Sequence, residues 1–279
     1  MKKVKYALPL LPFFLIILLF ELAPLCSILF NSFKVEGGTG ITLGNYIRAF
    51  TKPAYKVAII NSLTLTLFSS AMGIVIAFIA SAASRNSSLK VQNVFSAILN
   101  ITSNFAGVPL AFSYMIMLGN SGILTLIGQR YGIAALGNFD LYTRGGLGLM
   151  YVYFQIPLGT LLMLPALNAI KKQWKEAAAL MRASGIKFWF YIGVPVLLPS
   201  ILGTFSVLFC NALAAYATAY ALLASNYSLL PIGITNLFVG DIIMRKELGS
   251  ALSVIMMTLM TIAVLINQYV ISKNRREGI

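Results

Sequence analysis

Six long apolar stretches constrain this sequence more than any other feature. They cover residues 6–30, 58–82, 94–118, 147–170, 194–223 and 251–271. A helix needs about 20 mainly apolar residues to cross the hydrocarbon layer of a bilayer, and each stretch is long enough. With 59% hydrophobic and 10% charged residues, the chain has more apolar surface than a core of its own could bury. The sequence therefore predicts an all-α membrane protein with six transmembrane helices, solvated by a lipid bilayer.

The first apolar stretch is longer than the apolar region of a signal peptide, and Glu21 and several prolines interrupt it. We expect it to be retained as a membrane helix. We also expect residues 1–279 to form a single transmembrane domain. Within it, residues 1–57 hold the first helix and an outer segment, and residues 58–272 hold a five-helix core.

Positive charge is distributed unevenly between the connecting segments. Of the 21 Lys and Arg residues, 13 lie in the segments 1–5, 83–93, 171–191 and 272–279, which an even number of helices places on one side of the membrane. Loops rich in Lys and Arg stay in the cytoplasm. We therefore predict that both termini and the 171–191 segment are cytoplasmic. The net charge of +14 is explained by this orientation signal, and we expect no binding to nucleic acid.

The residues needed for most catalysis and metal binding are missing from the sequence. There is no His, and the few acids form no carboxylate pair. No phosphate-binding loop of the form G-x-x-x-x-G-K-[ST] occurs. Cys26 and Cys210 fall in apolar stretches and are interpreted as buried apolar side chains. We expect no enzyme activity, no catalytic residue, no metal site and no cofactor in this chain.

The segment 171–191 is the most amphipathic part of the chain outside the apolar stretches. Trp174, Ala177, Ala178 and Met181 recur at helical spacing, and three consecutive alanines favour a helix with a low-profile face. The aromatic run 188–191 is typical of the membrane surface, and Pro195 and Pro199 suit the first turns of the next helix. On these residues alone, the segment is either an amphipathic loop lying on the membrane or a helix that another surface approaches.

The segment resembles the EAA loop of ABC importer permeases. Glu176, Ala177 and Ala178 match the start of that motif, while Ile192 and Pro195 stand at its later offsets. Arg182 occupies the position of the motif's Gly, with Gly185 three residues later, so the sequence leaves open whether the usual turn forms there. The resemblance implies a coupling helix between helices 4 and 5, with the EAA loop at 171–195, that docks into a cytoplasmic ATPase. The residues implied in this contact are Glu176, Ala177, Ala178, Met181, Arg182, Ala183, Ser184 and Gly185.

The resemblance extends over residues 45–272 through "NYIRAF", "NSLTLTLFSSAMGIVIAF" and "LGLMYVYFQIPLGTLLMLPALNAI". It is nearest to the spermidine/putrescine-type group, and it implies a type I ABC importer permease fold in the inner membrane of a bacterium. The implied solute is of the polyamine, aminophosphonate, iron or thiamine type. The implied partners are an ABC ATPase dimer that holds ATP and Mg, an extracytoplasmic substrate-binding protein, and a second permease subunit, a heterodimer being favoured over a homodimer.

Polar side chains inside the apolar stretches mark a candidate translocation path, because such groups usually face protein or water. The candidates are Glu21, Asn100, Ser103, Asn104, Gln155, Asn211 and Thr218. The alternative for each is hydrogen bonding between packed helices. Glu21 has three possible roles: attracting a cationic substrate, pairing with a cation of the partner subunit, or simple exposure at a helix end.

Two other classes of function remain open on the sequence. An ion-coupled secondary transporter would need no ATPase, and that class commonly shows inverted repeats and functional charges within the membrane. A channel subunit would need a pore lining or filter. Neither set of features is recognisable in the sequence, so an importer permease is the favoured interpretation.

Overall fold

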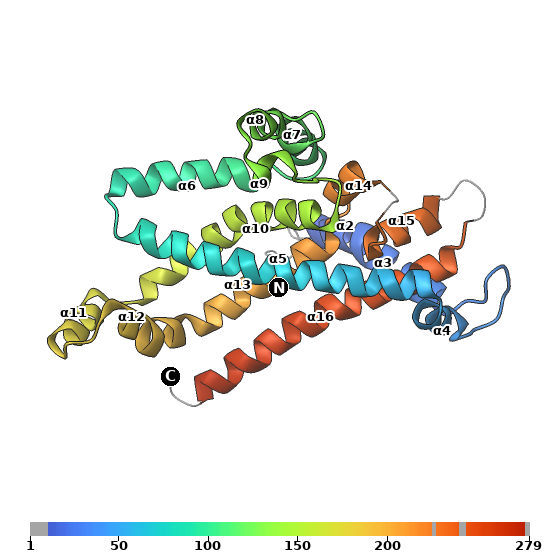
Figure 1. The fold of residues 1–279 in the computed structure, drawn as a ribbon. Helices are drawn as coiled ribbons and strands as arrows, with labels where there is room; N and C mark the ends of the chain where they lie inside the picture. Colours follow the sequence, from blue (N-terminus) through green and yellow to red (C-terminus); the bar gives the residue numbers. More distant parts are fainter. Residues whose placement is uncertain (1–10, 225–226, 240–243, 277–279) are drawn as a thin grey trace. The chain divides into compact units, whose positions relative to one another are not determined.

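The computed structural model describes residues 11–224, 227–239 and 244–276, and these are mostly helical (Figure 1). The helices are α2 (Leu11–Ile17), α3 (Ala23–Ser32), α4 (Gly44–Thr51), α5 (Pro53–Arg85), α6 (Leu89–Ser103), α7 (Val108–Leu118), α8 (Ile123–Tyr131), α9 (Ala134–Gly137), α10 (Arg144–Ala166), α11 (Lys172–Leu180), α12 (Gly185–Phe188), α13 (Val194–Ala214), α14 (Ala217–Leu223), α15 (Leu230–Val239) and α16 (Lys246–Arg276). Single π-helical turns at Leu18–Leu22 and Trp189–Gly193 connect α2 to α3 and α12 to α13.

The chain divides into two compact units. The N-terminal unit comprises Met1–Ile60 and Ser228–Thr258, and the core unit comprises Asn61–Tyr227 and Leu259–Ile279. Both α5 and α16 contribute residues to each unit.

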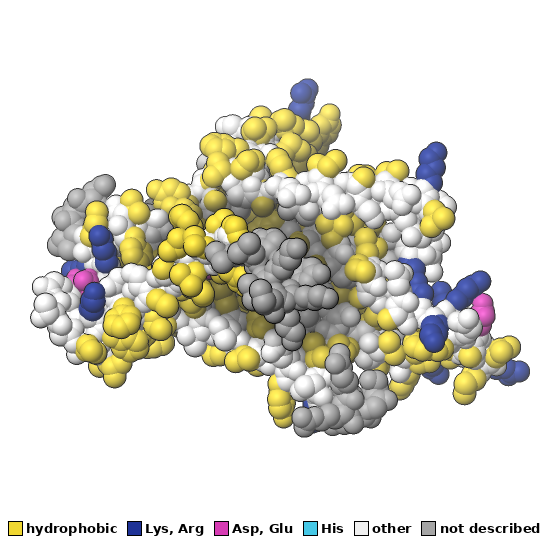
Figure 2. All heavy atoms as spheres, turned by 180° about the vertical axis from the view of Figure 1, so that it is seen from behind, with side chains coloured by type: hydrophobic (Ala, Val, Ile, Leu, Met, Phe, Trp, Pro, Cys, Tyr) yellow, Lys and Arg dark blue, Asp and Glu magenta, His cyan; other side chains and the backbone are white. Residues whose placement is uncertain are grey.

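Among the described residues, six segments are long and apolar enough to cross a membrane, which confirms the predicted number. They are Pro12–Ser32, Pro53–Arg85, Val108–Tyr131, Arg144–Ala169, Gly185–Ala214 and Lys246–Lys273. Figure 2 shows hydrophobic side chains exposed over much of the helix surfaces, which is the surface expected of a chain surrounded by lipid. The N-terminal cations Lys2, Lys3 and Lys5, on which the predicted orientation partly depends, lie outside the described residues.

Two predicted spans are wrong as single helices. The stretch 94–118 is divided between α6 and α7, because the chain leaves the helix at Asn104 and Gly107 adopts φ +71° and ψ −142°. That backbone conformation is readily available only to Gly. The stretch 194–223 is divided between α13 and α14 at Ala215. Here the Tyr151 hydroxyl donates to the Ala215 carbonyl oxygen at 2.6 Å and stabilises the break.

The first membrane helix of the N-terminal unit is not buried by the other described residues of that unit. The most apolar window of Pro12–Ser32 contains no buried residue. After this helix the chain forms a tight turn that packs against α4, where the buried Asn45 amide donates to the carbonyl oxygens of Ser32 and Lys34 at 3.1 and 2.8 Å. Glu36 in this turn forms ion pairs with Arg48 and Arg245.

The core unit is built around α10, which packs against α6, α7 and α13. Glycines allow close approach of the helices at its centre. Gly73 of α5 faces Gln155, where an added Cβ would come within 2.7 Å of the Gln155 Cβ. Gly159 lies against Ala77 and Leu208 in the same way. Small residues at helix contacts are typical of membrane proteins, where close packing replaces the hydrophobic effect.

Candidate functional site

The polar segment between α10 and α13 folds as a helix, a tight turn and a second short helix. α11 ends in a pair of hydrogen bonds: the Ala183 N–H donates to the Ala178 carbonyl at 3.0 Å, and the Arg182 N–H donates to the Ala179 carbonyl at 2.9 Å. This is the pattern of the Schellman motif, which closes a helix with one left-handed residue. The chain then restarts at Ser184, the N-cap of α12.

Arg182 is the left-handed residue of this turn, with φ +56°. It stands where the EAA motif has Gly, the residue that adopts this conformation without steric cost. An L-residue other than Gly pays about 1–2 kcal/mol there. The sequence alone did not decide whether a turn forms here, and the structure shows that it does. Arg182 has a strained backbone conformation in this turn, and its side chain is exposed.

One face of the segment is anchored on the core unit. Ala178 is 7% exposed and packs in a cluster with Leu167, Ile170, Phe188 and Leu197. Ala178 therefore fixes the position of α11 and has almost no surface left for another protein. The other coupling residues of the sequence prediction are exposed or half-buried.

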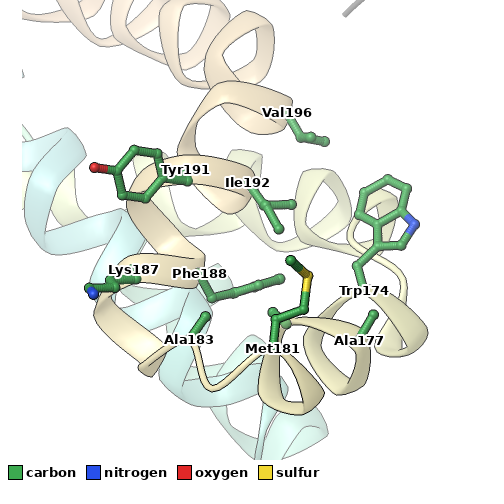
Figure 3. A pocket seen from close by; sticks show the side chains of 10 residues that line it. Trp174, Ala177, Met181, Ala183, Lys187, Phe188, Tyr191, Ile192 and Val196 are labelled. Atoms are coloured by element: carbon green, nitrogen blue, oxygen red, sulfur yellow. The ribbon is translucent and has the colours of Figure 1, made fainter.

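The opposite face carries large apolar side chains at its tip. Leu180 is 87% exposed and Met181 is 84% exposed, at the end of α11 that projects from the core unit. Beside them lies an open groove of about 610 Å³ between α11 and the start of α13. Figure 3 shows the side chains of Met181, Phe188 and Ile192 converging on it. An exposed apolar tip of this kind is typical of a surface that contacts another protein or a membrane.

A second feature lies at the other end of α13, where the two helix breaks meet. The Gly107 N–H donates to the Thr218 Oγ1 at 3.0 Å, which joins the break before α7 to α14. A cavity of about 400 Å³ lies between them, lined by Gly107, Thr218, Asn211, Phe154 and Tyr216 together with alanines. Irregular backbone at membrane depth occurs where it is buried in protein or lines a water-filled space.

The Gln155 side chain is fully buried next to this cavity and does not line it. Its Nε2 donates to the Leu208 carbonyl at 2.6 Å and to the Ser70 Oγ at 3.3 Å, and its Oε1 accepts from the Asn211 Nδ2 at 3.2 Å. The fully buried amide therefore fixes the orientation of Asn211, which is exposed at the cavity.

Known proteins with a similar chain architecture are ABC transport components. The chain is 18% identical to a subunit in the crystal structure of a bacterial ABC transporter involved in the import of the acidic polysaccharide alginate, with a TM-score of 0.74 over 100% of this chain and 99% of that one. It also matches a chain of the MetNI methionine ABC transporter, with a TM-score of 0.58 and 15% identity over 80% of this chain and 99% of that one. This is the fold of an ABC importer transmembrane subunit.

The sequence relatives of this chain include permease proteins. The chain is 26% identical over 232 residues to the sulfoquinovosyl glycerol transport system permease protein SmoH of Agrobacterium fabrum, which covers 78% of this chain and 75% of that protein. It is 28% identical over 214 residues to the probable starch degradation products transport system permease protein AmyC of Thermoanaerobacterium thermosulfurigenes, covering 72% and 70%. No protein-family model matches the sequence.

A third relative matches over a shorter region. The thiamine transport system permease protein ThiP of Haemophilus influenzae is 25% identical over 125 residues, which is 45% of this chain and 23% of that protein. The chain thus spans less than a quarter of that relative's length.

The structure brings together only some of the predicted path residues. Gln155, Asn211 and Thr218 meet around the cavity in the core unit. Asn100, Ser103 and Asn104 instead hydrogen bond to carbonyls within their own helix, at distances of 2.8 to 3.1 Å. Glu21 belongs to the N-terminal unit and is exposed in the π-helical turn Leu18–Leu22.

Several residues of these sites were missed by the sequence analysis. Leu180 is the most exposed apolar residue of the loop, and its position next to Met181 at the end of the alanine run was the available signal. Gly107 falls inside the stretch 94–118 that was predicted as one helix, although a Gly followed two residues later by Pro109 is typical of a helix boundary. Tyr151 had no sequence signal, because its hydroxyl acts on a residue 64 positions away.

Proposed function

We propose that this chain is the transmembrane permease subunit of an ATP-driven ABC importer. The observation that carries the proposal is the loop between α10 and α13. Its inner face is anchored through Ala178, while its tip exposes Leu180 and Met181. Water solvates large apolar side chains poorly, so a tip of this kind is stable only against another protein or a membrane. The permease names of the sequence relatives support a protein partner.

The proposed partner at this tip is an ABC ATPase dimer that binds ATP and Mg. In this proposal the chain is a transport subunit and hydrolyses no ATP itself. The exposed cation Arg182 follows the apolar tip and the exposed Lys187 lines the groove beside it, so the docking cleft on the ATPase is expected to be apolar at its centre and acidic at its rim.

The assembly we propose contains two further proteins. A second permease subunit completes the translocation path, a heterodimer being favoured, and an extracytoplasmic binding protein delivers the solute. The exposed apolar side chains of Pro12–Ser32 offer a surface on which a partner could pack within the membrane. The proposed location is the bacterial inner membrane, with both termini and α11 in the cytoplasm on the distribution of Lys and Arg.

The solute of this proposed importer is small and polar. The resemblance suggested polyamine, aminophosphonate, iron or thiamine, and two relatives are named for sugar-type solutes. The cavity favours a solute recognised by hydrogen bonds and aromatic contact, because none of the residues that line it is charged. A polyvalent cation would lose its hydration there without gaining a carboxylate. We therefore favour a hydroxyl-rich solute over a polyamine or a ferric ion.

The experiment that tests the proposal is co-purification from the native membrane. The tagged chain is extracted in mild detergent, co-eluting proteins are identified by mass spectrometry, and ATP hydrolysis is assayed. We expect an ABC ATPase and a second permease to be recovered. Leu180→Asp should abolish recovery of the ATPase, whereas Leu89→Asp, at another exposed leucine, should not.

Two results would contradict the proposal. One is a wild-type chain that purifies without an ATPase in several detergents. The other is solute uptake that survives ATP depletion and collapses with the ion gradient, which is the behaviour of a secondary transporter.

A further inference from the structure

The core unit has a second cavity near the loop, distinct from the apolar groove. Its volume is about 290 Å³, and it lies between the end of α5 and the start of α11. Four of the residues that line it are cationic: Arg85, Lys171, Lys172 and Lys175. We call it the basic pocket. All of its lining residues are described, and none of them is Asp or Glu.

Among the residues that the structure describes, the charges of the basic pocket are poorly compensated. Lys172 has the nearest acid, Glu176, at 3.6 Å, but both side chains are more than half exposed, so the pair contributes little. The Arg85 guanidinium donates to the Ile170 carbonyl, which leaves its formal charge unneutralised. The Lys171 Nζ lies 6.0 Å from the centre of the Trp174 ring, which is not a compensating charge. No side chain caps the first turn of α11, which adds the positive end of a helix dipole to the same region.

One wall of the basic pocket is aromatic and fixed in place. The Trp189 ring packs edge-on against Phe78 and Phe188, with centroids 5.4 and 5.8 Å apart. It also lies so close to Gly193 that a Cβ there would overlap the ring. Trp is enriched at the boundary between the hydrocarbon layer and water. The pocket thus combines a cluster of cations with an aromatic side, near the ends of the candidate membrane spans Pro53–Arg85 and Arg144–Ala169.

We infer that the basic pocket binds a phosphate-bearing anion. Several cations around one cavity repel each other until an anion neutralises them, and a phosphate accepts hydrogen bonds from Lys, Arg and backbone N–H groups together. Basic pockets between membrane helices on the cytoplasmic side take the headgroups of anionic lipids. The anion is the headgroup phosphate of an anionic phospholipid or a free phosphate. The cytoplasmic location of the pocket rests on the proposed function, whereas its capacity to bind an anion rests on the residues that line it.

Tryptophan fluorescence provides a direct test on the purified full-length chain. The sequence has two Trp residues, and Trp174→Phe leaves Trp189, in the pocket wall, as the single reporter. The chain in detergent is titrated with phosphatidylglycerol brominated in its acyl chains, and in parallel with brominated phosphatidylcholine. We expect the anionic lipid to quench Trp189 at much lower concentration than the zwitterionic lipid.

Charge variants then assign the effect to the pocket. Lys171→Gln/Lys175→Gln should weaken the binding of phosphatidylglycerol roughly thirtyfold, from the usual effect of two cations at a membrane surface. The control Lys90→Gln/Arg130→Gln removes the same charge from exposed sites outside the pocket, and its binding should be unchanged. Displacement of the lipid by inorganic phosphate in the wild type, but not in the pocket variant, would support the site and identify its natural ligand as a free phosphate.

Equal quenching by the two lipids, together with no effect of inorganic phosphate on Trp189 fluorescence, would overturn the inference, as would equal binding by the pocket variant and its control. If the pocket variant does not fold, the comparison of lipids on the chain with native lysines still decides. These measurements need no ATPase. Their failure is therefore distinct from failure of the proposed function, which is tested by co-purification.

Discussion

Replacing Gln155 by Leu tests whether a buried amide supports the cavity between the helix breaks. The two side chains have similar volumes, but the substitution removes the hydrogen bonds to Leu208, Ser70 and Asn211. Hydrogen bonds between membrane helices contribute about 0.6 kcal/mol each on average. We therefore expect Gln155→Leu to lower the free energy of unfolding by roughly 2 kcal/mol, measured by titration with denaturing detergent in mixed micelles.

A double-mutant cycle isolates the bond that reaches the cavity. Asn211→Leu alone, and together with Gln155→Leu, should give a coupling energy of about 0.6 kcal/mol, with an upper bound of about 1.7 kcal/mol. Asn100→Leu is the matched control, because the side-chain amide of this exposed Asn donates to the Ser96 carbonyl in its own helix. It should change stability by less than about 0.5 kcal/mol. Additive effects of the two cavity substitutions, or equal effects of Gln155→Leu and Asn100→Leu, would refute the reasoning.

Three further substitutions test other parts of the two sites. Arg182→Gly should stabilise the turn by roughly 0.5–1 kcal/mol, because relief of the left-handed strain exceeds the entropy lost by Gly. Amide hydrogen exchange in the turn should therefore slow. The control Arg182→Ala keeps the Cβ and should not slow this exchange. Thr218→Val leaves the Gly107 N–H without its acceptor and should cost about 1–3 kcal/mol in thermal or chemical unfolding, whereas Thr218→Ser should retain stability. Ala178→Asp buries a carboxylate, so it should lower the free energy of unfolding by more than about 3 kcal/mol and release the ATPase. Ala179→Asp, at the exposed neighbour, should do neither. Equal losses in both variants would contradict the anchoring role of Ala178.

The number of membrane helices could be predicted from the sequence, because hydropathy reports burial in lipid directly. The 171–191 segment could also be predicted, since its charges and alanines contrast with the apolar stretches on both sides. Gln155, Asn211 and Thr218 were recognisable as polar groups in apolar surroundings. Their grouping around one cavity was not, because it depends on how α10, α13 and α14 are packed.

The helix breaks were outside the reach of hydropathy, because the sequence reads as one continuous apolar stretch across each break. The first break has a local cause in the backbone of Gly107. The second has a tertiary cause, the Tyr151 hydroxyl that binds the Ala215 carbonyl. The Arg182 turn lies between these cases. The resemblance marked the position as one that needs Gly, and the Schellman hydrogen bonds explain how Arg is accommodated there.

The anchored loop and the cavity lie at opposite ends of α13. This helix runs without a break over its 21 residues, a length of roughly 30 Å, so a displacement at its start can reach Asn211 and the break at Ala215. We expect α13 to transmit movement of the docked loop to the cavity. Val207→Gly adds a flexible residue at an exposed position of α13, at a cost of about 1 kcal/mol. Transport should then fall while recovery of the ATPase is retained. If transport were unchanged in this variant, or if it fell only in proportion to the ATPase recovered, α13 would not be the element that transmits the movement.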